Sequence, residues 1–367
     1  MKIFRKTLKV AVLVVTVLSV VSLLLAYTST FISPAKTPEI AFFGLGYPVI
    51  LAFNLLFLIF WIIKQSRWGW IILVSLLIGI PIHLRFFQFN FADNTEDSDA
   101  TTLRVLSYNV ELFGWYHWRS NIQRRNQMFD QIDRNRADIY CFQEFFYTNV
   151  PNRFDTRDSL TALLDAPHYH DHYTHEMYNV QFYGIATLSK YPIVDRGVIE
   201  FPNDKNNICI FSDLLVDDEI IRVYNGHLCS IRFSGDEHEF VGDLQSDPGL
   251  LERSKVARIY LRLKHAFQKR AWQAELIRNH MADCPYPIIF CGDFNDTPVS
   301  YAYNVFNELL TDVFRSRGRG IGNTYIGNFP SFRIDYIFTS PEFGHTHFKV
   351  LPEELSDHRA IWGEVSY

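Results

Sequence analysis

The sequence predicts an α+β fold in which a two-sheet sandwich with outer helices follows three membrane-spanning helices. Apolar stretches at residues 10–32, 40–63 and 68–91 each reach the roughly 20 residues that a helix needs to cross a bilayer. Strand-like apolar runs alternate with a few amphipathic helices over residues 103–367, and such strand-rich halves pack as two sheets covered by helices. Residues 92–102 are polar and acidic without periodicity, which is typical of a linker.

The first 91 residues are interpreted as a membrane region with three transmembrane helices. The first two apolar stretches contain no charged residue, and the third carries only His83 and Arg85 near its end, where a basic side chain can reach the interface. A cleaved signal peptide is the alternative for the first stretch, because a basic segment precedes it. Its apolar run is longer than a signal peptide needs, and two more stretches follow, which favours three spans.

Basic residues predict the orientation in the membrane. They gather before the first stretch and in the loop after the second, at Lys2, Arg5, Lys6, Lys9, Lys64 and Arg67. Such segments remain in the cytoplasm. Three crossings then place residues 92–367 outside the cytoplasm, anchored to an inner or plasma membrane, and we expect a bacterial periplasmic location.

The charge of the chain is divided unevenly between its two parts. Residues 1–91 carry eight Lys/Arg and one acidic residue, which leaves 27 Lys/Arg and 39 Asp/Glu, a net charge of −12, for residues 92–367. Proteins that hold nucleic acid through their overall field are usually basic. The acidic balance therefore disfavours tight non-specific binding of nucleic acid, although a bound metal ion can reverse the local sign.

The soluble part is expected to contain these elements in chain order. Strands are predicted at residues 103–110, 137–144, 286–293, 333–340 and 360–365, and helices at residues 122–136, 250–281 and 301–310. Further strand-like runs fill residues 182–229, where Asp217 and Asp218 are a plausible hairpin turn. The helix at 250–281 is amphipathic and carries eight Lys/Arg. Its basic residues form either a solvated outer face or a face toward anionic lipid.

Polar side chains follow the predicted strands at the points where the strands end. The set comprises Asn109, Glu144, His227, Asp293, Asn295, Asp335, Asp357 and His358. Each residue alone is most simply a turn former or a hydrogen-bonded surface group. Together they supply three kinds of group needed to hydrolyse a phosphoester: carboxylates for a hard cation, a carboxylate for the attacking water, and amide and imidazole donors for the phosphate oxygens.

The ordered motifs SYNV, FQE, GHL, CGDFND, RIDYIF and SDH, with YGIATLSKYPI at residues 183–193, resemble those of the endonuclease/exonuclease/phosphatase family. That family includes DNase I, AP endonucleases, sphingomyelinases, inositol-polyphosphate 5-phosphatases and deadenylases. The resemblance covers residues 103–367 and implies the four-layer α/β/β/α sandwich of DNase I. It implies a divalent-metal-dependent phosphoester hydrolase, with Mg²⁺ or Mn²⁺ as the cofactor.

The resemblance also implies roles for individual residues. Metal binding falls to Glu144, with Asn109 and Asp357 nearby. The catalytic roles fall to Asp293, which positions or deprotonates the water, Asn295, which contacts the phosphate, His358, oriented by Asp335, and His227, which donates to the phosphate or the leaving group.

The substrate class remains open at this point. AP endonucleases lack a histidine at the position of His227 and differ after Asn109, so the sequence is less similar to repair enzymes. The candidates are a nuclease-like phosphodiesterase and a lipid head-group phosphodiesterase or phosphatase. A non-catalytic membrane binding module is a remote alternative, because all the expected site residues are present. The predicted partners are a phosphoester substrate and the bilayer, and no protein partner is inferred.

Overall fold

The fold is described from a computed structural model of the chain. It describes residues 2–90, 101–116, 121–150, 154–202, 204–231, 253–327 and 331–367. The predicted linker at residues 92–102 therefore lies almost wholly outside the described residues.

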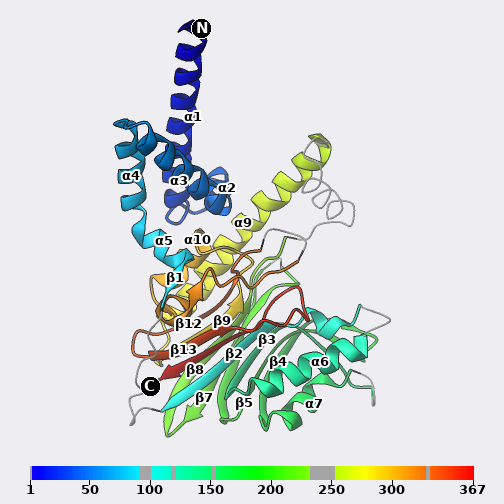
Figure 1. Ribbon diagram of the computed structural model, residues 1–367. Coiled ribbons are helices and arrows are strands. Elements are labelled where there is room, and N and C mark those ends of the chain that lie inside the picture. Colours follow the sequence, from blue (N-terminus) through cyan, green and yellow to red (C-terminus); the bar gives the residue numbers. More distant parts are fainter. Residues whose placement is uncertain are drawn as a thin grey trace.

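Five helices form the N-terminal region (Figure 1). They are α1 (Lys2–Thr28), α2 (Pro38–Leu45), α3 (Tyr47–Ile63), α4 (Trp68–Ile78) and α5 (Ile80–Phe86). Within α1, residues 6–28 are long and apolar enough to cross a membrane. The helix pairs α2–α3 and α4–α5 are each apolar enough for one span but bend by 62° and 63°.

Each of the apolar stretches at residues 40–63 and 68–91 is divided into two helices by a bend. Pro48 and Pro81 each lie within the first two positions of the helix that follows the bend. A proline ring collides with the carbonyl group four residues earlier and offers no N–H, so a continuous helix breaks before it. The breaks therefore fall at Gly46 and Gly79, where one helix ends and the next begins.

The last predicted span also ends earlier than expected. Helix α5 stops at Phe86, and the chain continues into strand β1 (Gln88–Phe89), which pairs antiparallel with β11 (Arg319–Gly320). The buried Arg333 guanidinium donates to the carbonyl oxygen of Arg85 at 2.8 Å. Backbone pairing and this buried hydrogen bond join the N-terminal region to the second half of the chain.

Two six-stranded sheets form the rest of the molecule. One runs in the order β10 (Thr311–Asp312), β12 (Asp335–Thr339), β9 (Ile288–Asp293), β8 (Glu219–His227), β7 (Ile208–Val216), β6 (Ile193–Ile199). The other runs in the order β13 (Gly344–Val350), β14 (Ile361–Ser366), β2 (Thr102–Asn109), β3 (Ile139–Thr148), β5 (Gln181–Ser189), β4 (His168–Met177). The predicted strands are confirmed within a few residues.

Helices cover both outer faces of the sandwich (Figure 1). The sheet that contains β2 packs against α6 (Asn121–Arg134) and α7 (Thr156–Leu163), and the sheet that contains β9 packs against α9 (Arg253–Ala282) and α10 (Tyr301–Asn307). A third apolar cluster fills the space between the sheets. The short η1 (Glu111–Gly114) and α11 (Val313–Arg317) complete the described elements. The observed architecture is the expected four-layer α/β/β/α sandwich.

Candidate active site

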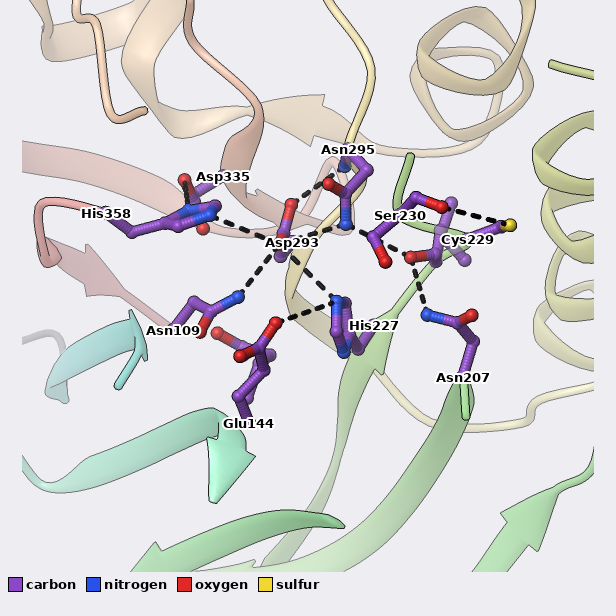
Figure 2. A network of polar contacts seen from close by, with 12 residues as sticks. Asn109, Glu144, Asn207, His227, Cys229, Ser230, Asp293, Asn295, Asp335 and His358 are labelled. Carbon is purple, nitrogen blue, oxygen red and sulfur yellow. Dashed lines mark hydrogen bonds and ion pairs between the residues drawn. The ribbon is translucent and has the colours of Figure 1, made fainter. Parts of the chain in front are cut away.

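Strand alternation places the predicted site residues on the inner faces of the two sheets. In β9, Ile289 and Cys291 point into the inter-sheet cluster while Ile288 and Phe290 face the helices. Successive side chains of a strand alternate between its faces, so Asp293 at the end of β9 faces inward. The same period brings inward the residues that end or begin three other strands, namely Asn109, His227 and Asp335. The two sheets thus converge on one cluster of polar groups (Figure 2).

Glu144 reaches this cluster through a break in the alternation. Simple alternation along β3 would turn it outward, but the pairing of β3 with β5 shifts its register between Phe142 and Phe145. The backbone of Glu144 has φ +49°, a left-handed conformation that costs a residue with a Cβ atom roughly 1–2 kcal/mol. Such bulges redirect a side chain, and here the bulge turns the Glu144 carboxylate toward His227, 3.9 Å away.

The electrostatics around Glu144 oppose its ionisation. Its side chain keeps 37% of its area open to solvent, but the surrounding protein restricts hydration of the carboxylate. This burial, followed by the negative charge of Asp357, raises the pKa of Glu144 to about 7. A carboxylate held in this state is one that a cation would stabilise.

Asp293 is the centre of the hydrogen-bond network (Figure 2). Its Oδ2 atom accepts from Asn109 Nδ2 at 3.0 Å and from Asn295 Nδ2 at 3.1 Å, and its Oδ1 atom accepts from the Asn295 backbone N–H at 2.8 Å. Asn295 adopts φ +53°, a conformation that asparagine tolerates. Burial raises the pKa of Asp293, with His358 opposing this effect. The carboxylate is fixed in orientation and made more basic.

Two histidines flank Asp293. His358 Nε2 lies 3.7 Å and His227 Nε2 lies 3.6 Å from Asp293 Oδ2. His358 Nδ1 contacts Asp335 Oδ2 at 2.9 Å, which fixes its ring orientation. Burial lowers the pKa of His358, but the charges of Asp335 and Asp293 outweigh it and raise that pKa well above its ordinary value. The two carboxylates therefore favour the protonated form of His358 beside Asp293.

Asp357 occupies the rim of the cluster. It is partly exposed, and the Oγ atom of its neighbour Ser356 donates to the Asn109 carbonyl at 2.8 Å. This bond ties the loop that carries Asp357 and His358 to the end of β2. Asp357 acts on Glu144 through its charge, as expected of two carboxylates that share one site.

A second group of possible metal ligands differs from the predicted one. Single ligand atoms of Asp293, Asp335 and His358 lie within 4.8 Å of one another. However, Asp335 and His358 already share a hydrogen bond, so we interpret them as an orienting pair. Glu144 is a carboxylate outside this group, and burial followed by the negative charge of Asp357 opposes its ionisation.

Two buried amides behind the site were not predicted. Gln143 Nε2 donates to Asn225 Oδ1 at 2.7 Å, and Asn225 Nδ2 donates to the Ala186 carbonyl at 2.9 Å. Gln143 lies in β3 and Asn225 in β8, so this bond joins the two sheets next to Glu144 and His227. The available signal was a polar residue inside each of two apolar strands, since buried amides need partners.

A buried arginine of α9 holds the loops that follow two catalytic strands. Arg270, only 1% exposed, contacts Asp296 Oδ2 through Nε at 3.0 Å and donates to the Cys229 carbonyl at 3.2 Å. Gln273, one turn later, accepts from the Cys229 N–H at 2.8 Å. Asp296 and Cys229 follow Asp293 and His227 closely. Arg270 and Gln273 thus fix the loops that follow β8 and β9. The sequence signal for both residues was their position on the apolar face of the helix.

Solved structures with a similar fold act on different substrates or carry different ligands. They include zebrafish (D. rerio) TDP2 complexed with single-strand DNA product (15% identity, 73% of this chain, 100% of that chain, TM-score 0.51). The human Nocturnin catalytic domain with bound sulfate is also similar (17% identity, 75% of this chain, 99% of that chain, TM-score 0.50). So is a Bacteroides thetaiotaomicron mannosyl-6-phosphatase (17% identity, 72% of this chain, 100% of that chain, TM-score 0.50). At these identities the likeness concerns the fold. Among curated protein sequences, none matches the chain.

Two family models divide the chain as the structure does. A domain of unknown function (DUF8431) matches residues 5–86, which are the N-terminal helices. The Endonuclease/Exonuclease/phosphatase family matches residues 106–358, which contain every residue of the site described above. The match spans well over half of the chain, and the sandwich and the inward-facing cluster agree with it. The chain therefore belongs to the endonuclease/exonuclease/phosphatase family of phosphoester hydrolases.

Proposed function

We propose that the protein is a membrane-anchored, divalent-metal-dependent phosphoester hydrolase. The observation that carries the proposal is the placement of Asp293. Its carboxylate is oriented by amide donors from Asn109 and Asn295 and lies between two histidines. This arrangement fits a group that aligns a water molecule for attack on phosphorus.

The residues around Glu144 fit a hard divalent cation, Mg²⁺ or Mn²⁺. Burial, followed by the negative charge of Asp357, raises the pKa of Glu144, and a bound cation would offset both effects. Carboxylate and amide oxygens are the ligands that such ions prefer. Glu144, with Asn109 and Asp357, would hold the ion. When bound, the ion would neutralise the phosphate and the charge that develops during hydrolysis.

The remaining groups manage protons and the phosphate oxygens. Asp293 accepts a proton from the attacking water. The imidazolium of His358, held by Asp335, donates to a phosphate oxygen as negative charge grows there. Asn295 contributes an amide donor to the phosphate, and His227 donates to the phosphate or to the leaving oxygen. The geometry of these groups fits both nucleic acid and smaller phosphoesters.

The test of this function is hydrolysis of bis-p-nitrophenyl phosphate by the full chain in detergent, with Mg²⁺, with Mn²⁺ and with excess EDTA. We expect release of p-nitrophenol with either ion. EDTA should abolish the release, and re-addition of the metal should restore it. Turnover that is unchanged in EDTA would contradict the metal-dependent mechanism, and no turnover with either ion would contradict hydrolysis itself.

We further propose three membrane spans, made by α1, by α2 with α3 and by α4 with α5, which leave the catalytic domain in the periplasm. The length of α1 and the apolar character of both bent pairs support this arrangement, as does the positive-inside distribution. Alkaline phosphatase fused after Tyr367, at the end of the sandwich far from the helices (Figure 1), should be active in a bacterial host. Activity only from a reporter that requires the cytoplasm would contradict this topology.

A further inference from the structure

The loop that follows the catalytic strand β9 packs directly on the N-terminal helices. Val299, six positions after Asp293, is only 1% exposed. It belongs to an apolar cluster with Leu23, Ala26, Tyr27, Tyr47 and Ile82. Its carbonyl oxygen accepts from Ser29 Oγ, just beyond the end of α1, at 3.2 Å. One short segment thus runs from the central carboxylate of the site to the helices of the membrane region.

Helix α9 makes a second connection between the same two regions. Its Lys264 Nζ donates to Glu39 of α2 at 3.0 Å. The Tyr260 and Phe267 rings lie 5.0 and 5.2 Å from the Phe42 ring, stacked and edge-on respectively. Figure 1 shows the first half of α9 rising from the sandwich beside α2. Residues 260–267, in the middle of α9, therefore lie beside α2, and the start of α9 extends beyond it (Figure 1).

The same helix reaches the active site less than two turns later. Arg270 follows Lys264 by six residues, roughly 9 Å along a helix, and binds the loops after Asp293 and His227. The distance from the membrane-region contact to the catalytic loops is thus short compared with the thickness of a bilayer, about 30 Å. With the membrane spans proposed above, the site would lie close to the membrane surface.

The first half of α9 has the composition of a helix at a membrane interface. Leu261 is 61% exposed, Val256 41% and Tyr260 38%. Basic residues alternate with them at Lys255, Arg258, Arg262 and Lys264. Exposed apolar side chains among basic residues suit the boundary between acyl chains and anionic head groups. We call Val256, Tyr260 and Leu261 the interfacial face of α9.

We propose that the active site takes an amphiphilic phosphoester that is embedded in the bilayer, with its phosphate in the head-group layer and its apolar part left in the membrane. The proposal rests on the proposed function. Water adds to phosphorus as one P–O bond breaks, Asp293 takes a proton from the water, and the leaving oxygen receives a proton from His227 or from solvent. One product stays in the membrane. Residues 92–367 carry a net charge of −12, and this negative charge disfavours binding of a long polyanion such as nucleic acid.

The test uses the full chain reconstituted into phosphatidylcholine vesicles. The probes are dioleoyl phosphatidic acid and dioleoyl phosphatidylglycerol in the bilayer, their water-soluble dibutyryl forms, plasmid DNA and bis-p-nitrophenyl phosphate. We expect at least one dioleoyl lipid to be hydrolysed about tenfold faster than its dibutyryl form at equal bulk concentration, because the bilayer concentrates and orients it at the site.

The outcomes separate the two proposals. Hydrolysis of bis-p-nitrophenyl phosphate without hydrolysis of either dioleoyl lipid overturns the bilayer substrate and leaves the proposed function intact. Faster cleavage of plasmid DNA or of the dibutyryl forms overturns it as well. Failure to hydrolyse bis-p-nitrophenyl phosphate with either metal ion is instead a failure of the proposed function.

A substitution in the interfacial face tests the role of α9. Leu261→Asp should lower hydrolysis of the dioleoyl lipid by about tenfold, since an exposed leucine gains free energy on entering an apolar environment and a charged aspartate does not. Hydrolysis of bis-p-nitrophenyl phosphate should not change. Leu163→Asp, at an exposed leucine of α7, is the matched control and should affect neither reaction. An equal loss of both activities in Leu261→Asp would mean that Leu261 has only a structural role.

Discussion

Replacing Asp293 with asparagine is expected to lower kcat for bis-p-nitrophenyl phosphate by about 10²–10⁴-fold, the usual contribution of a positioned general base. Asp293 is the one carboxylate that contacts Asn109, Asn295 and both histidines within the described parts of the chain. An amide cannot take a proton from water at neutral pH. The reaction would lose its proton acceptor while the metal ligands stay in place.

The fold should survive this substitution. The asparagine keeps only one acceptor oxygen for the donors around it, which lowers the stability. It also removes the charge of a buried carboxyl group whose pKa is already raised, which increases the stability, so the two effects oppose each other. Circular dichroism should therefore be unchanged, and KM should change less than kcat. Asp283→Asn, at an exposed position after α9, is the matched control. A fully active Asp293→Asn protein would remove the role assigned to this carboxylate.

Glu144→Gln is expected to weaken binding of Mn²⁺ on the order of 100-fold or more, because even partners of metal ligands contribute 10–100-fold to affinity. Glutamine keeps the size of the side chain and loses its charge. Titration calorimetry of the wild type should also show a pH dependence. With the Glu144 pKa near 7 in the absence of metal, protons compete with the ion below that pH, so the apparent Kd should rise about tenfold per pH unit below 7.

Glu144→Gln, which is expected to weaken metal binding, should instead stabilise the metal-free protein at high pH. The pKa of Glu144 is higher in the folded chain than its ordinary value, so its contribution to stability is present at low pH and is lost as the pH rises through about 7. At pH 8 without metal, Glu144→Gln should therefore have a higher Tm than the wild type, and saturating Mn²⁺ should reverse the order. Glu176→Gln, at an exposed glutamate of β4, should change neither Kd nor Tm. Equal Mn²⁺ affinity in Glu144→Gln and wild type would contradict its role as a ligand.

Much of the sandwich could be predicted because its signals are local. The run around Asp217 and Asp218 predicts a tight hairpin, and both residues adopt positive φ, +47° and +70°, between β7 and β8. Apolar alternation predicts the inner strands, and their ends carry the site residues. Strands β4 and β13 were missed, because their sequences HYHDHYTHEM and GHTHFKV are polar edge strands without an apolar run.

The parts of the site that could not be predicted depend on contacts between distant segments. The bulge that turns Glu144 inward is a property of the pairing between β3 and β5, and nothing in FQE specifies it. The Gln143–Asn225 bond crosses from one sheet to the other. Arg270 binds loops that are distant in sequence, so its position on the apolar face of a helix could indicate burial but not these partners.

The pairing of β1 with β11, and the bond from Arg333 to the Arg85 carbonyl, have a consequence for separating the catalytic domain from the N-terminal helices. A protease that cut the chain between residues 90 and 101 would sever the covalent link but leave these contacts and the Val299 cluster in place. The nicked catalytic domain should stay attached. Cleavage between residues 90 and 101 is therefore not an efficient way to release the catalytic domain from the N-terminal helices.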